Sequence, residues 1–399
     1  MKLKRIFAPP FHFTRRILAK LWLTSHPKVT VIGITGSYGK TNTTAAIAQI
    51  LAHKFKTLQT DLNLDTLHNI PITILHLGDQ EKLVLEYGVD HPGEMNTHLF
   101  TAKPLVSVVT GISPVHADSE HFGNLEKIIT EKTKLVAALP KGGFAILNWD
   151  DPNVRRMSQA TKAQVIFFGT DPKNCQVWVE KVKVSFKGTE FLLHVHEEQI
   201  KIKTKLIGSH YIYNLMAAAA VALTQKMTLK EISVAVENLK PLDGRLSVGP
   251  GPKNTVIIND SRRANPASAI AGLQTLHDLP AKRKIAVLGE MGELGNYNEE
   301  GHRQVGKFIK NIKLDYLIGV GDSTKFIVQE AKKQMRKERV ILAKDVFEAA
   351  GILNTILQKG DLWYLKGSLL KHVERIVLLL EGKDVDPDEI ASHRYEVYR

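Results

Sequence analysis

The chain has a single cysteine, Cys175, among its 399 residues. One cysteine excludes an internal disulfide framework and any zinc site built from several cysteines. The sequence also has no apolar run long enough to cross a bilayer, and its basic first ten residues lack the apolar core and small-residue cleavage site of a secretory signal. These absences predict a cytoplasmic protein.

Acidic residues are in the minority. The chain has 54 lysines and arginines against 41 aspartates and glutamates, a formal net charge of +13. This balance suits anionic partners such as nucleotides, nucleic acid or a membrane surface. Because the basic residues form no patch interleaved with aromatic side chains, we expect no nucleic-acid partner. A hydrophobic fraction of 43% at this length predicts two or three domains with cores of their own.

Segment 1–28 precedes the first predicted strand. From residue 11 to residue 23 three basic residues, Arg15, Arg16 and Lys20, stand among apolar residues at near-helical spacing. This pattern predicts a basic amphipathic helix. Such a helix lies on an anionic membrane or packs against the protein's own body. Packing on the body is the favoured interpretation, and peripheral membrane contact stays open.

Strands and helices alternate from residue 29 to residue 245, which predicts a mostly parallel sheet covered by helices. The predicted strands are 29–34, 82–86, 105–110, 144–148 and 165–168, and the predicted helices include 41–53, 125–138 and 214–224. Residues 176–205 instead alternate polar and apolar side chains, which predicts an antiparallel hairpin at the edge of the sheet.

A smaller, Rossmann-like α/β domain is predicted for residues 246–399. Its predicted strands are 255–259, 284–288, 316–320 and 361–365. The boundary rests on the turn at Asp243 and Gly244 and on the restart of the strand pattern. The predicted α/β fold thus consists of a basic N-terminal segment (1–28), a central phosphate-loop domain (29–245) and a C-terminal domain (246–399).

The most informative segment is 29–44, where a β-branched strand runs into a glycine loop and then into Lys40 and Thr41 at the start of a helix. The backbone N–H groups of such a turn converge at the positive end of a helix and bind phosphate. Lys40 is placed to reach terminal phosphates, and the Thr41 hydroxyl to hold Mg²⁺. Strict Walker spacing has its first glycine where Ile34 stands. The glycines here are Gly33, Gly36 and Gly39.

Three later segments narrow the function. Glu86 ends an apolar strand, and a carboxylate there, beside a phosphate loop, is placed to bind Mg²⁺. His116 follows another apolar strand, and Lys132 lies on the next predicted helix. Each residue taken alone has an ordinary interpretation: a solvated strand-end acid, a structural histidine and a solvated basic face.

Together with the loop, these segments resemble the Mur ligase superfamily, most closely its MurF-type enzymes, from about residue 29 almost to the C-terminus. The resemblance implies an ATP-dependent ligase of peptidoglycan precursor synthesis. Such an enzyme adds D-alanyl-D-alanine to a UDP-N-acetylmuramoyl-tripeptide through an acyl phosphate. The partners it implies are a small-molecule wall precursor and a dipeptide, and the cofactors are ATP and Mg²⁺.

The resemblance also assigns site residues. The implied ATP-binding residues of the loop are Gly36, Ser37, Gly39, Lys40, Thr41 and Asn42. The implied metal ligands are Thr41, Glu86, His116 and Lys132, and the implied catalytic residues are Lys40, His116 and Lys132. Lys132 matches a lysine that is carbamylated in the family to help hold a second Mg²⁺. Lys134 is the rival for that role, but the register from Phe122 favours Lys132.

The implied nucleotide contacts outside the loop are His210, Asn214, Arg245 and Asp260. The chain departs from the family's usual pattern at Tyr211, Arg262 and Arg263. Because these positions adjoin nucleotide and second-substrate contacts, the identity of the incoming amine stays open. Arg262 and Arg263 are candidates for gripping a phosphate or a substrate carboxylate.

MurF-type enzymes carry an N-terminal domain that holds the UDP end of the precursor, whereas here the phosphate loop follows little more than one basic helix. We therefore expect the precursor to be recognised elsewhere on the chain, carried differently, or held with a partner. Two other functions stay open. Segment 290–295 disfavours a folylpolyglutamate synthase-like ligase, and the full set of metal-site residues disfavours a non-catalytic ATP-binding scaffold.

Overall fold

The computed structural model describes residues 2–61, 66–242, 246–368 and 371–386. The chain divides into two compact units. The first contains Met1–Val182, Glu190–Lys203 and Ile212–Leu239, and the second contains Lys183–Thr189, Thr204–Tyr211 and Lys240–Arg399. The predicted domain boundary at residue 245 lies outside the described residues.

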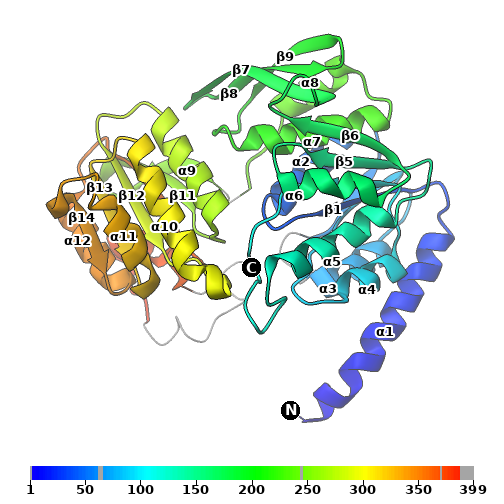
Figure 1. Ribbon diagram of the computed structural model, residues 1–399, viewed down its shortest axis with the longest axis horizontal. Coiled ribbons are helices and arrows are strands. Elements are labelled where there is room, and N and C mark those ends of the chain that lie inside the picture. Colours follow the sequence, from blue (N-terminus) through cyan, green and yellow to red (C-terminus); the bar gives the residue numbers. More distant parts are fainter. Residues whose placement is uncertain (1, 62–65, 243–245, 369–370, 387–399) are drawn as a thin grey trace. The chain divides into compact units, whose positions relative to one another are not determined.

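The first unit is built on a nine-stranded sheet with the order β2-β3-β1-β4-β5-β6-β7-β8-β9 (Figure 1). Its first six strands are β1 (Thr30–Thr35), β2 (Thr57–Gln59), β3 (Lys82–Glu86), β4 (Val106–Val109), β5 (Phe144–Asn148) and β6 (Gln164–Gly169). These strands pair in parallel throughout. The central residues of β1, β3, β4 and β5 are buried and mostly apolar, as a sheet covered on both faces requires. The predicted parallel α/β sheet is confirmed.

Helices connect these strands, and two more follow the last strand of the sheet in sequence. They are α2 (Lys40–Leu51), α3 (Thr66–Leu75), α4 (Glu94–Thr101), α5 (Leu125–Ala137), α6 (Pro152–Arg155), α7 (Tyr211–Thr224) and α8 (Leu229–Glu237). Helix α5 begins where the Asn124 side chain accepts a hydrogen bond from the Lys127 backbone N–H, which satisfies one N–H group of its first turn. Helix α8 begins with a capping box between Thr228 and Glu231. The sequence thus fixes where both helices start.

Residues 176–205 form three strands rather than the two of the predicted hairpin: β7 (Val177–Ser185), β8 (Gly188–Val195) and β9 (Glu198–Thr204). Strand β7 pairs with β6 in parallel. Two residues connect each of the three strands to the next, a length that joins only antiparallel neighbours. The alternating pattern was interpreted correctly as edge structure, but its third strand was missed.

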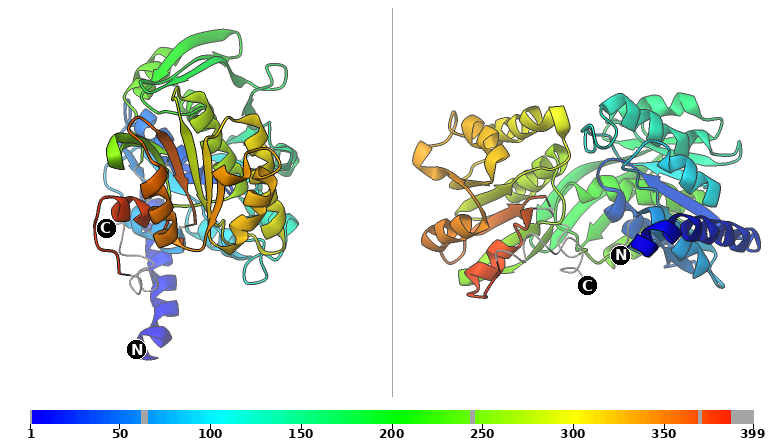
Figure 2. Two further views of the ribbon diagram at one scale, coloured as in Figure 1. Left: turned by 90° about the vertical axis from the view of Figure 1, so that its left-hand side faces the viewer. Right: turned by 90° about the horizontal axis from the view of Figure 1, so that it is seen from below.

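Helix α1 (Lys2–Thr24) packs against α3 and α4 (Figures 1 and 2). Ala19 is fully buried in this contact, and the Trp22 indole N–H donates to the Leu77 carbonyl at 2.9 Å. The favoured interpretation, packing on the protein's own body, is therefore confirmed. Of the helices in the described ranges, none has the length and apolar character needed to cross a membrane.

The second unit contains a six-stranded sheet with the order β10-β11-β15-β12-β13-β14. Its strands are β10 (Ser247–Gly251), β11 (Thr255–Asp260), β12 (Lys284–Gly289), β13 (Tyr316–Val320), β14 (Val340–Ala343) and β15 (Leu362–Lys366). The helices are α9 (Pro266–Asp278), α10 (Asn298–Phe308), α11 (Lys325–Ala331), α12 (Val346–Ile356) and α13 (Arg375–Leu380). Pairing is parallel except at β10, which runs antiparallel to β11. A second, Rossmann-like α/β unit is confirmed.

Candidate active site

The phosphate loop joins β1 to α2. Gly36 has φ +145° and Gly39 has φ +76°, conformations that glycine adopts readily and other residues rarely. The loop lies against the end of β4, since the Thr110 hydroxyl donates to the Tyr38 carbonyl at 2.5 Å. A Cβ atom at Gly36 would lie 2.1 Å from the Thr110 oxygen. Both glycines are therefore required by the shape of the loop.

Hydrogen bonds tie the loop to the segment that follows β4. The Ser37 backbone N–H donates to the Gly111 carbonyl at 2.7 Å, and the Ser37 hydroxyl to the Ser113 carbonyl at 3.0 Å. The Lys40 ammonium donates to the Gly36 carbonyl at 3.0 Å. Gly39, the N-cap of α2, supplies no side-chain acceptor to the first turn. The N–H groups of that turn are thus suited to an anion.

Asn214 and Asn42 lie at this loop. The Asn214 side-chain amide, from α7, donates to the Gly39 carbonyl at 3.1 Å and to the Thr43 hydroxyl at 2.8 Å. Asn214 therefore supports the loop backbone, in addition to the nucleotide contact predicted for it. The Asn42 side-chain oxygen is buried and has no hydrogen-bond partner among the described residues. A buried polar atom of this kind needs a ligand, a water or an ion to satisfy it.

Lys132, on α5, is 3% exposed. Burial, and then the positive charge of Lys40, lower its pKa from 10.5 to about 7, although Asp90, Glu86 and Glu131 oppose the shift. These electrostatic neighbours show that the fold brings Lys40, Glu86 and Lys132 together. Within the described ranges the Lys132 ammonium makes no hydrogen bond or ion pair. A lysine with this pKa is substantially neutral at pH 7 and above, the form that reacts with CO₂ to give a carbamate.

Lys134 is placed differently. Its ammonium pairs with Glu131 at 2.7 Å, and a third of its side chain is exposed. The other carboxylate oxygen of Glu131 accepts the Met95 backbone N–H at 2.9 Å, so Glu131 is fixed to α4. Buried Lys132 is therefore better suited than Lys134 to the carbamate that the resemblance implies.

His116 adopts a left-handed backbone conformation, with φ +66°. A non-glycine residue in this region stores strain, which is common at functional sites. Its Nδ1 atom lies 3.4 Å from a carboxylate oxygen of Asp90, and the ring of His121 meets it edge to face at 5.1 Å. Asp90 was not predicted from the sequence. The signal available was its position four residues after Glu86, past the same strand end.

The donor atoms gathered here fit the cofactors that the resemblance implies. Magnesium prefers oxygen ligands, and Thr41 and Glu86 offer a hydroxyl and a carboxylate. Lys132 offers no ligand as an ammonium, but its lowered pKa permits a carbamate with carboxylate-like oxygens. Three or more histidine, cysteine, aspartate or glutamate side chains do not converge on one point in the described structure. The implied ligand set contains only one glutamate and one histidine, so it does not depend on such a cluster.

Asp260 lies in the second unit, at the end of β11. Its carboxylate accepts hydrogen bonds from the Lys366 ammonium at 2.5 Å and the Tyr364 hydroxyl at 3.2 Å. Lys366 also donates to the Arg263 carbonyl at 2.8 Å. This buried ion pair therefore ties β11, β15 and the loop at Arg263 together. Arg245, another predicted nucleotide contact, lies outside the described residues.

His210, predicted to contact the nucleotide base, is also in the second unit. Burial, and then the positive charge of Lys366, lower its pKa to about 3, so the imidazole is neutral. Its Nδ1 atom lies 3.5 Å from the Thr275 hydroxyl. Its Nε2 atom is buried and has no partner in the described part of the chain. A neutral imidazole with one unsatisfied nitrogen is suited to a hydrogen bond with a neutral ligand.

Replacing Gly36 by alanine is expected to weaken nucleotide binding at least about 10-fold. The new Cβ would lie 2.1 Å from the Thr110 oxygen at a φ of +145°, so the loop must shift and its N–H groups diverge. A loss of 1.4 kcal/mol already corresponds to tenfold in affinity. Calorimetric titration with ADP measures the effect.

Gly142→Ala is the matched control, because no atom lies within 4 Å of the Cβ built at Gly142. Its affinity for ADP should equal that of the unmodified protein. Equal affinities for all three proteins would show that the loop does not bind the nucleotide.

Two known protein domain families match this chain. The Mur ligase middle domain matches residues 34–222, and the Mur ligase glutamate ligase domain matches residues 244–369. The first match contains the phosphate loop, Glu86, His116 and Lys132, and the second contains Asp260 and Lys366. Together the two matches cover most of the chain.

Curated relatives are named UDP-N-acetylmuramoyl-tripeptide--D-alanyl-D-alanine ligase. That of Escherichia coli (strain K12) is 31% identical over 302 residues, which are 75% of this chain and 66% of the relative. That of Mycobacterium tuberculosis (strain H37Rv) is 32% identical over 301 residues, 73% of this chain and 58% of the relative. The chain thus spans less than two thirds of the length of each of these two proteins.

Solved structures of MurF proteins have a fold similar to that of this chain. A crystal structure of MurF from Acinetobacter baumannii has a TM-score of 0.84 and 25% identity, covering 93% of this chain and 81% of that one. MurF from Thermotoga maritima, solved in complex with ADP, has a TM-score of 0.82 and 24% identity, covering 93% of this chain and 84% of that one. The second likeness, at this identity, concerns the fold alone. From the two domain matches, the relatives and the shared fold, the chain belongs to the Mur ligase family.

Proposed function

We propose that this protein is an ATP-dependent amide ligase of peptidoglycan precursor synthesis that joins D-alanyl-D-alanine to a UDP-N-acetylmuramoyl-tripeptide. The observation that carries the proposal is the buried Lys132, with a pKa of about 7, in the electrostatic neighbourhood of Lys40 and Glu86. A protein that only bound ATP would have no use for a buried reactive amine beside its phosphate loop. The names of the relatives support the substrate pair.

In the proposed reaction the precursor carboxylate attacks the γ-phosphate of ATP, ADP leaves, and an acyl phosphate forms. The amine of the dipeptide then attacks the acyl carbon and loses a proton, phosphate leaves, and an amide bond remains. The N–H groups of the loop and of the first turn of α2 would hold the phosphates of ATP. The Lys40 ammonium would offset the negative charge that builds up during phosphoryl transfer.

We assign the Mg²⁺ ligands to Thr41, Glu86, His116 and carbamylated Lys132. Bound Mg²⁺ supplies charge neutralisation and polarises phosphoryl oxygens. Asp90 would hold the proton on Nδ1 of His116, which leaves the Nε2 lone pair for a ligand role. Asn214 would keep the loop in its binding shape. His210, Arg245 and Asp260 are the proposed nucleotide contacts away from the loop.

The proposed partners are small molecules, and the proposed location is the cytoplasm, where nucleotide-linked precursors and ATP are available. Peripheral contact of the N-terminal basic helix with a membrane belongs to the same proposal. It is supported by seven lysines and arginines in residues 1–28 and by the absence of any acidic residue before Asp61.

Incubation with ATP, Mg²⁺, UDP-N-acetylmuramoyl-tripeptide and D-alanyl-D-alanine should release phosphate and give a product whose mass equals both substrates minus water. Phosphate release should require both substrates. Lys40→Met should reduce turnover at least about 100-fold, because a charged group that stabilises the phosphoryl transition state is lost.

Lys54→Met is the matched control. Lys54 pairs at the surface with Glu231, so turnover should be unchanged. Turnover with a folate and glutamate, but with no wall precursor, would instead identify the protein as a folylpolyglutamate synthase-like ligase. Tight ATP binding without turnover of any such pair would identify a scaffold.

A further inference from the structure

Helix α1 presents an apolar face on the side away from its own packing contact. Its inner face carries Ala19, which is fully buried. On the outer side Leu18 is 53% exposed and Leu21 is 62% exposed, with Ile17 beside them at helical spacing. A helix on the surface of a soluble protein normally turns polar side chains outward. Here large apolar side chains also lie on the outer side, which the described part of the protein leaves exposed.

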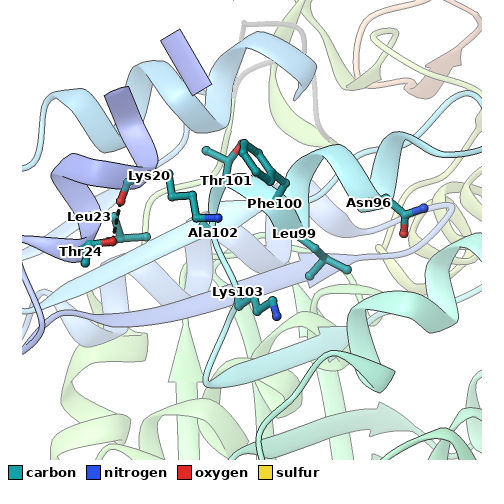
Figure 3. Close-up of a pocket in the computed structure, with 9 residues that line it drawn as sticks. All are labelled: Lys20, Leu23, Thr24, Asn96, Leu99, Phe100, Thr101, Ala102 and Lys103. Atoms are coloured by element: carbon teal, nitrogen blue, oxygen red, sulfur yellow. Dashed lines mark hydrogen bonds between the residues drawn. The ribbon is translucent and has the colours of Figure 1, made fainter. Parts of the chain in front are cut away.

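The apolar surface continues from α1 onto α4. Phe13 of α1 stacks against Phe100 of α4 with ring centroids 6.3 Å apart, and both rings are more than 40% exposed. Between the two helices is a hollow of about 580 Å³ (Figure 3). Its lining includes Lys20 and Leu23 of α1, Leu99 and Phe100 of α4, and Lys103. The Lys20 ammonium lies 4.2 Å from the centre of the Phe100 ring.

The charged side chains that line the hollow, Lys20 and Lys103, are both basic. Arg16 precedes Lys20 by one helical turn. Helices α1 and α3 contain no aspartate or glutamate, and α4 contains only Glu94, at its first residue. Glu94 accepts the backbone N–H groups of Asp90 and His91, and it does not line the hollow.

We infer that the outer face of α1, together with the α1–α4 hollow, docks the protein on an anionic lipid bilayer. Leucine and phenylalanine side chains would enter the interfacial region of the bilayer, and basic side chains would contact lipid phosphates. Interfacial amphipathic helices bind membranes in this way. A second copy of this chain is the less suitable occupant, because two such faces would bring like charges together. Because α1 is packed on α3 and α4, docking would orient the whole first unit.

This surface goes beyond the helix contact proposed above, since it includes α4 and the hollow, and it does not depend on the reaction. The test is sedimentation of the full chain with vesicles of phosphatidylcholine alone and of phosphatidylcholine with 30% phosphatidylglycerol. The protein should bind only the anionic vesicles, and binding should fall as NaCl is raised.

Two variants test the two parts of the surface. Leu18→Glu/Leu21→Glu should reduce binding at least about 10-fold, because it puts two acids on the outer face. Lys20→Gln/Lys103→Gln should reduce it about 25-fold at low salt, about fivefold for each charge. The matched controls are Val234→Glu, at an apolar residue 42% exposed on α8, and Lys173→Gln/Lys187→Gln, at two exposed lysines.

Circular dichroism and ADP binding should be the same for all variants, which separates loss of docking from loss of folding. Three results would overturn the inference: no binding of the unmodified chain to anionic vesicles, equal losses in the control variants, or light scattering that shows a dimer abolished by Leu18→Glu/Leu21→Glu. Ligase turnover is measured separately with soluble substrates, so failure of the docking surface and failure of the proposed reaction are distinguishable.

Discussion

Replacing Lys132 by methionine is expected to abolish ligase activity and, at the same time, to stabilise the folded protein. Methionine fills a similar volume but can neither form a carbamate nor carry a charge. Turnover should fall by about 10³-fold or more, since several kcal/mol of charge stabilisation in the transition state are lost. If Lys132 served only to stabilise the fold, its replacement by methionine would instead lower the stability of the protein.

The stability change follows from the direction of the pKa shift. The pKa of Lys132 is lowered from 10.5 in the unfolded chain to about 7 in the folded one. The unfolded chain therefore binds more protons between these values, so the free energy of unfolding rises with pH in this window. The cost of burying the charge is fully present below pH 7 and is relieved as pH approaches 10.5. A pKa difference of this size corresponds to roughly 4–5 kcal/mol.

Lys132→Met should therefore unfold at a higher temperature than the unmodified protein at pH 6–7, and the difference should shrink toward pH 10. Differential scanning calorimetry without bicarbonate measures it. Lys134→Met is the matched control on the same helix, where an ion pair to Glu131 is lost. We expect that control to keep most of its activity and to gain no stability. Equal stability of Lys132→Met and the unmodified protein at pH 6 would contradict the argument.

The parallel strands were the most predictable part of the fold. β3, β5 and β13 have the predicted ends, because each is a short apolar run bounded by polar residues or turns. β10, with the sequence Ser-Val-Gly-Pro-Gly, was missed because glycine and proline indicate a turn. The structure places it at the antiparallel edge of the second sheet, where proline is tolerated because one side of the strand is unpaired.

The site residues that belong to a recognisable sequence motif could be predicted. Lys40 follows the glycine loop, and Glu86 ends an apolar strand, so each has a signal in its own neighbourhood. Glu131 had none, because an acidic residue on a helix is usually solvated, and the only signal for Asp90 was its position four residues after Glu86. Their effect on Lys132 arises only from three-dimensional proximity. The same limit explains why sequence did not show that Asn214 supports the loop from another helix.

Replacing Asp260 by asparagine is expected to destabilise the second unit by about 3–5 kcal/mol. Lys366 is 2% exposed, and its ammonium bonds to the Asp260 carboxylate at 2.5 Å. Removal of one partner of a buried ion pair leaves an uncompensated buried charge, which lowers the free energy of unfolding strongly. The Tyr364 hydroxyl, which also donates to Asp260, would lose its charged acceptor.

The double variant Asp260→Asn/Lys366→Met should be less destabilised than the sum of its two single variants, because no charge is then left buried without a partner. Calorimetry of the unfolding transition of the second unit measures all three. Glu299→Gln, which removes an ion pair to Arg303 from an acid more than half exposed, is the control and should cost less than about 1 kcal/mol. Additive losses in the double variant would mean that Asp260 and Lys366 stabilise the unit independently. The cost would then come from hydrogen bonds to neighbouring groups rather than from the charge pair.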